Sequence, residues 1–176
     1  MTSAPAVRLV VVDPADEALR LALVALRPAP EQEEFSASAD RTLPEAITNP
    51  ARTPFAVCAD GEPVGFGVLD REGYLDELVD APERAALLRG FYVAARHQGR
   101  GIGTAAAAQV PALAAGLYDD ADLVVLTVNE RNPAAITAYE RAGFRDTGVR
   151  YLGGDAGPQH VLVAAVTLEG STGQPL

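Results

Sequence analysis

The chain has 176 residues, 48% of them hydrophobic, which predicts one domain at residues 1–169 and a disordered tail at 170–176. The formal net charge of −10 argues against a nucleic-acid partner, because binding to phosphates depends on basic side chains. All 14 basic residues are arginines, which excludes a lysine-containing phosphate loop and Schiff-base chemistry, and the single cysteine, Cys58, excludes a disulfide framework.

Signals for a membrane or a metal are missing from the sequence. No stretch reaches the roughly 18 consecutive apolar residues of a membrane span, and the N-terminal apolar run ends at Asp13-Pro14 before any cleavage-like pattern. His97 and His160 have no cysteine or carboxylate at ligand spacing, so we expect no metal. A lone cysteine is typical of a reducing compartment, and we expect a cytoplasmic protein without a membrane partner.

The charges are distributed unevenly along the chain. Residues 31–84 contain 13 acids and 4 arginines, a net charge of −9. Residues 85–118 contain three arginines and no acid. This asymmetry predicts two ligand surfaces, one for cations and one for anions.

Apolar runs and turn signals in the first half predict strands and helices in alternation. Asp13 and Pro14 form a helix-start signature, and Leu19, Leu23 and Leu26 follow at helical spacing. The expected elements are a buried strand at 7–12, a helix capped by Asp13, helical pieces at 31–38 and 42–49, and a hairpin of strands 55–59 and 64–69.

The second half begins with an acidic connection at 70–85, which has little apolar periodicity and holds at most a short helix. The remaining pattern alternates strands and helices. It predicts a fourth strand at 87–94 interrupted by Gly90, a helix at 104–117 kinked at Pro111, a buried fifth strand at 123–128, a helix from Asn132-Pro133 to Gly143, and strands at 144–152 and 160–168.

The fourth strand leads into Gln98-Gly99-Arg100-Gly101-Ile102-Gly103, which opens a helix. Amides at a helix N-terminus carry partial positive charge, and glycines let a phosphate approach them closely. Arg96 and Arg100 would add charge-assisted bonds, so the turn predicts a pyrophosphate site. A tight strand-to-helix connection is the alternative. A dinucleotide fold is disfavoured, because the glycines alternate strictly and the turn lies mid-chain after a hairpin.

A second block of residues follows the glycine turn. It consists of Leu126-Thr127-Val128, Asn132, Ala135, Tyr139 and Gly143-Phe144. In order and spacing, this block and residues 91–104 resemble the GCN5-related N-acetyltransferases, the GNAT superfamily. The resemblance extends from about residue 57 to 147.

The resemblance implies a single α/β (α+β) domain whose mixed, mostly antiparallel sheet has about seven strands, splayed between the fourth and fifth, with about four helices. It also implies acetyl-CoA as cosubstrate and direct acetyl transfer to an amine. Tyr139 would protonate the thiolate, because a tyrosine with a pKa of about 10 is protonated at neutral pH; a core aromatic is its alternative. Coenzyme contacts would come from Phe91, Tyr92, Val93, Gln98, Gly99, Arg100, Gly101, Ile102, Gly103, Thr104 and Asn132, the last of which could also be a helix cap.

One position departs from the family pattern. Many members place a glutamate on the fourth strand to activate the amine, and the comparable position here is Arg89. Proton removal would then use ordered water, or an acid from 31–34 or from the 70–83 connection.

The acceptor is a small-molecule primary amine under this interpretation. Residues 30–35, 43–46, 64–67 and 143–148 resemble the diamine and polyamine acetyltransferase subgroup, and the acidic region suits a cationic substrate. An amino acid, an antibiotic or a protein N-terminus is the alternative acceptor, and a non-catalytic acyl-CoA-binding domain is the alternative class. Homodimers are common in the superfamily, but the sequence shows no interface.

Overall fold

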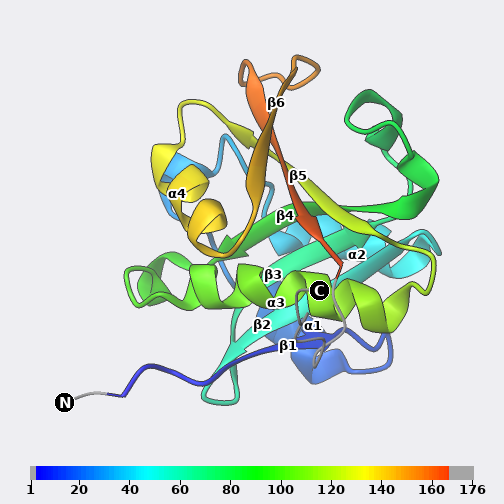
Figure 1. Cartoon of the computed structure of the whole chain (residues 1–176). Coiled ribbons are helices and arrows are strands. Elements are labelled where there is room, and N and C mark those ends of the chain that lie inside the picture. Colours follow the sequence, from blue (N-terminus) through cyan, green and yellow to red (C-terminus); the bar gives the residue numbers. More distant parts are fainter. Residues whose placement is uncertain (1–2, 167–176) are drawn as a thin grey trace, which may run out of the picture.

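A seven-stranded mixed sheet organises the computed structural model, which describes residues 3–166 (Figure 1). The strand order is β1-β2-β3-β4-β5-β7-β6, and only the β4–β5 pairing is parallel. The strands are β1 Val7–Val11, β2 Arg52–Ala59, β3 Glu62–Asp70, β4 Ala85–Val93, β5 Leu123–Asn129, β6 Arg145–Tyr151 and β7 Gln159–Ala165. This sheet confirms the expected mixed, mostly antiparallel topology. The expected tail at 170–176 lies outside the described residues.

Four α-helices cover the two faces of the sheet. They are α1 Glu17–Val24, α2 Ala39–Thr48, α3 Ile102–Leu117 and α4 Pro133–Arg141. The alanine-rich side of α3 packs with α4 on one face, while α1 and α2 bury their leucines on the other (Figure 1). Each face therefore has its own hydrophobic core.

The parallel strands β4 and β5 stay together for only three residue pairs, Ala85–Leu87 against Leu123–Val125. Beyond Leu87, β4 continues along β3 and β5 continues along β7, so the two strands separate. The predicted splay between the fourth and fifth strands is confirmed.

A β-bulge at Gly90 accompanies this separation. Two residues of β4, Gly90 and Phe91, oppose the single residue Gly67 of β3, and Gly90 has a φ of 58°. Glycine adopts this left-handed conformation without the steric cost of a side chain. The bulge is the interruption that the sequence predicted.

Several helix boundaries differ from the sequence prediction. Asp13 accepts a bond from the Ala15 amide in a local turn, and the helix cap is Asp16, which accepts from Leu19; the assignment of the cap to Asp13 and of the first helical residue to Pro14 is wrong. Only a short 3-10 turn, Pro30–Gln32, forms where a helix at 31–38 was expected. The helix α2 begins at Ala39, three residues before the expected start at 42. The helix α3 begins at Ile102, two residues before the expected start at 104, and continues through Pro111.

Tyr92 holds together the two ends of the segment between α1 and α2. Its buried hydroxyl donates to the Leu26 carbonyl at 3.1 Å and accepts from the Ala39 amide at 2.9 Å. Residues 27–38 are thereby fixed at both ends, and between these ends the 3-10 turn Pro30–Gln32 is their only helical element. Burial raises the pKa of the Tyr92 hydroxyl, which keeps it protonated and able to donate.

We predict that Tyr92→Phe destabilises the protein by about 1–3 kcal/mol, because the buried Ala39 amide loses its partner and the Leu26 carbonyl keeps only its bond from Arg27 Nη1. At this chain length each kcal/mol lowers the melting temperature by roughly 2–4 °C. The matched control is Tyr151→Phe, since the Tyr151 hydroxyl bonds to no residue in the described part of the chain. Equal melting temperatures for the two variants would contradict the assigned role of Tyr92.

Candidate functional site

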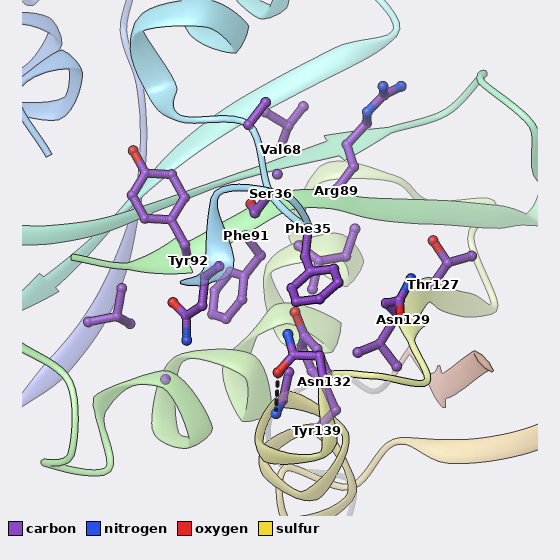
Figure 2. Close-up of a pocket in the computed structure, with 18 of the residues that line it drawn as sticks. Phe35, Ser36, Val68, Arg89, Phe91, Tyr92, Thr127, Asn129, Asn132 and Tyr139 are labelled. Atoms are coloured by element: carbon purple, nitrogen blue, oxygen red, sulfur yellow. Dashed lines mark hydrogen bonds between the residues drawn. The ribbon is translucent and has the colours of Figure 1, made fainter. Parts of the chain in front are cut away.

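A cavity of about 560 Å³ opens where β4 and β5 separate (Figure 2). Its walls come from β4, β5, the first turns of α3, the helix α4, and the loop before α2. Figure 2 shows Phe91, Asn132 and Tyr139 around the cavity, with Phe35 and Ser36 crossing it. Residues from both separated strands, β4 and β5, therefore line the same pocket.

The edge of β4 offers backbone groups to this cavity. The Ala94 amide bonds to Val64 of β3 at 2.8 Å, so the alternate residues Phe91 and Val93 direct their peptide groups toward the open edge. The Val93 carbonyl accepts a bond from the Gln98 side chain at 2.9 Å. The Val93 amide and the peptide groups of Phe91 are left for a ligand.

One end of the cavity is formed by the glycine turn and the start of α3. Gly99 and Gly101 both have a φ of 76°, and a Cβ added to either would meet no protein atom within 4 Å. Positive φ is therefore what requires glycine there. Gly101 precedes the first turn of α3, whose amides have no partner within the helix. This end suits an anion.

The helix α4 places two polar side chains beside the cavity. Asn132 caps the helix by accepting from the Ala135 amide at 3.3 Å, and its side-chain Nδ2 has no acceptor among the residues that the structure describes. Tyr139 lies two turns along the same helix and points into the cavity (Figure 2). Asn132 thus combines the cap with a place in the pocket wall.

The ring of Tyr139 is fixed by two aromatic neighbours. Its centroid lies 6.1 Å from that of Phe91 and 5.8 Å from that of Phe144, in tilted and edge-on geometry. Burial raises the pKa of the hydroxyl above its ordinary value. Within residues 3–166 the hydroxyl makes no hydrogen bond, so it is a protonated donor without a protein acceptor.

The other end of the cavity contains a buried charge cluster. Asp70 is fully buried and accepts from Arg52 Nε at 3.0 Å and from Arg89 Nη1 at 2.9 Å. Arg52 also contacts Glu45 at 2.8 Å. The carboxylate of Asp70 thus pairs with the guanidinium groups of Arg52 and Arg89. Arg89 lies at the β4 position that the sequence analysis compared with the glutamate of many GNAT members.

Three carboxylates line the pocket, namely Glu34, Glu45 and Asp155, whereas Asp70 lies behind the wall. Glu34 lies 3.3 Å from Arg131, whereas Asp155 has no ion pair or hydrogen bond with any residue that the structure describes. Of the acids expected at 31–34 only Glu34 reaches the pocket wall, and none from the 70–83 connection does. Asp155 escaped sequence analysis because its glycine-rich surroundings have the pattern of an ordinary turn.

Residues 19–144 match the sequence profile of the acetyltransferase (GNAT) family. The chain belongs to this family. The matched residues include both the glycine turn at 98–103 and the segment 126–144 that contains Asn132 and Tyr139.

Two bacterial N-acetyltransferases are similar to this chain in sequence. The acetyltransferase is 28% identical over 123 residues to the uncharacterized N-acetyltransferase YbbJ of Bacillus subtilis, covering 70% of this chain and 77% of the relative. It is 34% identical over 102 residues to the aminoglycoside N(6')-acetyltransferase type 1 of Klebsiella aerogenes, covering 57% and 63%.

Solved structures show the same fold. AAC(6')-Ib in complex with paromomycin and acetyl-CoA superimposes with a TM-score of 0.65 at 23% identity, covering 90% of this chain and 93% of that one. The spermidine N-acetyltransferase of Vibrio cholerae with CoA and spermine gives 0.61 at 17% identity, covering 91% and 95%. The chain is an acetyl-CoA-dependent N-acetyltransferase.

The structure brings most of the predicted site residues of this acetyltransferase to one cavity. Its walls include Phe91, Tyr92, Val93, Gln98, Ile102, Gly103, Asn132 and Tyr139. Gly99, Arg100, Gly101 and Thr104 lie in the adjoining turn and helix start but not in the wall. The donors on β4 and at the start of α3 fit an elongated ligand that has an anionic end.

The described residues show neither a cluster of metal-ligating side chains nor a helix that could span a membrane. No group of three or more potential metal-ligating side chains occurs within residues 3–166. In the same range, every helix is too short or too polar to cross a bilayer.

We predict that Gly101→Asp abolishes the acetyl-CoA-induced rise in melting temperature, because it adds a negative charge at the anion-binding helix start. In the parent protein, acetyl-CoA at about 100 times its dissociation constant should stabilise by about 2.7 kcal/mol. The control is Gly61→Asp in the β2–β3 turn, which has a comparable φ of 86° and no protein atom near its added Cβ. An intact shift in Gly101→Asp would remove the assignment of the anionic end.

Proposed function

We propose that this acetyltransferase moves an acetyl group to a primary amine of a small polycationic acceptor, such as a polyamine or an aminosugar. The observation that carries this proposal is Asp155, a carboxylate in the pocket wall without a partner among the described residues. Asp155 is exposed, and its unpaired carboxylate attracts an ammonium group through a charge interaction that salt partly screens.

The charges around the cavity support a cationic ligand. Arg52 and Arg89 are balanced by Asp70 and Glu45, and Glu34 is balanced by Arg131. Asp155 is the carboxylate left over from this pairing. A cationic acceptor would be attracted by that charge, whereas an anionic acceptor would be repelled by it.

The names of the relatives are consistent with this acceptor class. Of the two solved structures, one contains paromomycin and the other contains spermine. Both ligands are small molecules that carry several amino groups. We therefore propose an acceptor with several amino groups, and a substrate panel would distinguish a polyamine from an aminosugar.

The coenzyme would be held by the β4 edge and the start of α3. Phe91 and Val93 would supply backbone groups to its arm, with Tyr92 between them directed to the opposite edge of β4. Gln98, Gly99, Arg100, Gly101, Ile102, Gly103 and Thr104 would supply the amides and the charge around its phosphates. Asn132 would donate its free side-chain amide.

Bound acetyl-CoA supplies an activated carbonyl and a thiolate leaving group. Tyr139 holds a proton on a hydroxyl that points into the cavity, and burial keeps that proton in place by raising the pKa. We assign to Tyr139 the role of donor to the departing sulfur. Phe91 and Phe144 fix the direction of the donation.

The acceptor amine must lose a proton before it attacks. Asp70 is paired with Arg52 and Arg89 in a fully buried site and does not line the cavity, so it is not placed to meet the amine. Asp155 is the free carboxylate of the pocket, and we assign it to ammonium binding and to reception of the proton, directly or through water.

We predict that Tyr139→Phe lowers kcat by about 100-fold, near the lower end of general acid catalysis, because coenzyme A thiolate is itself a fair leaving group. Acetyl-CoA binding and the melting temperature should change little, since the ring and its aromatic contacts remain. In the parent protein, ionisation of this hydroxyl should cause no loss of rate below about pH 10. Full turnover by the variant would make Tyr139 a packing residue only.

We predict that thiol release with acetyl-CoA is fastest with polycations in a panel of spermidine, spermine, kanamycin, amino acids and short peptides. Asp155→Asn should raise KM for the productive polycation about 10-fold and weaken its dependence on salt, because one attractive charge is removed. The control is Asp119→Asn, an exposed acid outside the pocket wall. Turnover of amino acids or peptides alone would reject the polycation proposal.

A further inference from the structure

Arg131 joins the two loops that flank the cavity. It lies between β5 and α4, and its Nη2 is 2.8 Å from the Ala156 carbonyl and 3.3 Å from Glu34 Oε2. Its guanidinium carbon is 5.5 Å from the centroid of the Phe35 ring, within the range of a cation–π contact. One side chain therefore contacts both the 33–38 loop and the 152–158 loop.

The 152–158 loop forms the fixed side of this arrangement. Asn129, buried at the end of β5, donates its side-chain amide to the Ala156 carbonyl at 2.9 Å and accepts from the Arg131 amide at 2.9 Å. The Glu130 amide bonds to the Pro158 carbonyl at 3.2 Å. These bonds position Arg131 and the neighbouring Asp155 independently of the 33–38 loop.

The 33–38 loop is tied much more weakly. The amides of Phe35 and Ser36 bond back to the Gln32 carbonyl, and Gln32 bonds to Gln98 at 2.8 Å. Within the described chain, the Glu34–Arg131 pair is the one hydrogen bond or ion pair that joins residues 33–37 to a segment outside the loop between α1 and α2. The middle of the loop therefore depends on Arg131 for its position.

This loop carries groups that face the cavity. Phe35 and Ser36 both line it and cross it in Figure 2. The Ser36 hydroxyl is buried and has no hydrogen-bond partner among the described residues. Since a buried hydroxyl without a partner costs free energy, an acceptor with polar groups would satisfy it.

We propose that Arg131 is a positioning residue that holds Phe35 and Ser36 over the cavity and so sets the affinity for the acceptor. The Glu34–Arg131 pair has half-exposed side chains, 53% and 55%, so it is weak and screened by salt. Such a contact breaks and re-forms readily. The loop opens to admit an acceptor and closes over it through Arg131, while Tyr139 and the coenzyme end stay in place.

The proposal rests on the acetyltransferase function for its kinetic test but not for its structural test. The structural test is hydrogen exchange in the free protein, followed at the Phe35 and Ser36 amides. Arg131→Ala should speed their exchange about 3- to 10-fold, because the loop loses its outer contact. Arg131→Lys, which keeps the charge but not the planar fork, should give an intermediate rate.

The kinetic test uses spermine and kanamycin as acceptors. Arg131→Ala should raise the acceptor KM by about 3- to 10-fold and leave kcat and the KM for acetyl-CoA within about 2-fold, because the loop contributes to acceptor binding and not to the proton donor. Arg131→Lys should restore part of the affinity.

The control variant is Arg141→Ala, which removes the same charge from the exposed end of α4. If Arg131→Ala and Arg141→Ala show the same exchange rates at Phe35 and Ser36, the positioning role is overturned. If exchange accelerates but neither acceptor is turned over, the loop contact stands and the proposed acceptor class fails. If exchange accelerates and the acceptor KM stays unchanged, the loop does not contribute to acceptor binding and the proposal is overturned.

Discussion

The short pairing between β4 and β5 is the constraint on which the rest of the site depends. Parallel hydrogen bonding ends after Leu87, and from there each strand keeps its other neighbour, β3 or β7. Backbone groups at a strand edge that meets no other strand still need partners, because unpaired buried amides are costly. The separation therefore creates both the space and the hydrogen-bonding demand that an elongated ligand satisfies.

The arrangement of polar groups around this separation divides the cavity into two ends. Positive-φ glycines and the first amides of α3 define an end that suits an anion, whereas under the proposed function Asp155 would attract the cationic acceptor. Tyr139 lies in the same cavity, held by aromatic contacts from β4 and from the residue before β6. Asp155 lies outside the acidic region at 31–84 that the sequence analysis assigned to a cationic ligand, so that assignment stays a prediction.

Arg89 illustrates how a single substitution is accommodated within this fold. A guanidinium in place of a carboxylate on β4 would add an unpaired charge to a half-buried wall, but Asp70 at the end of β3 bonds to it and to Arg52. In this cluster the positive charges of Arg89 and Arg52 are balanced by Asp70 and Glu45, so Arg89 adds no unpaired charge to the cavity wall. Asp155, the pocket carboxylate without a partner among the described residues, comes from the loop between β6 and β7.

The sequence determined the parts of this protein that depend on local patterns. The β-branched runs gave the central strands, the Asp60-Gly61 turn gave the hairpin, and the glycine turn with Asn132 and Tyr139 marked the family and most of the cavity wall. Helix starts were less predictable: Asp13 and Asp16 are both competent caps, and a local turn at Asp13 delays the helix.

Only the tertiary structure decided which charges remain free. Whether an acid is paired depends on arginines far away in sequence, as Asp70 with Arg52 and Glu34 with Arg131 show. No periodicity encodes such contacts, because they arise from the way strands and loops are brought together. For the same reason Asp155, in a loop with an ordinary turn pattern, became a pocket residue only once the ends of β5 and β7 were placed beside it.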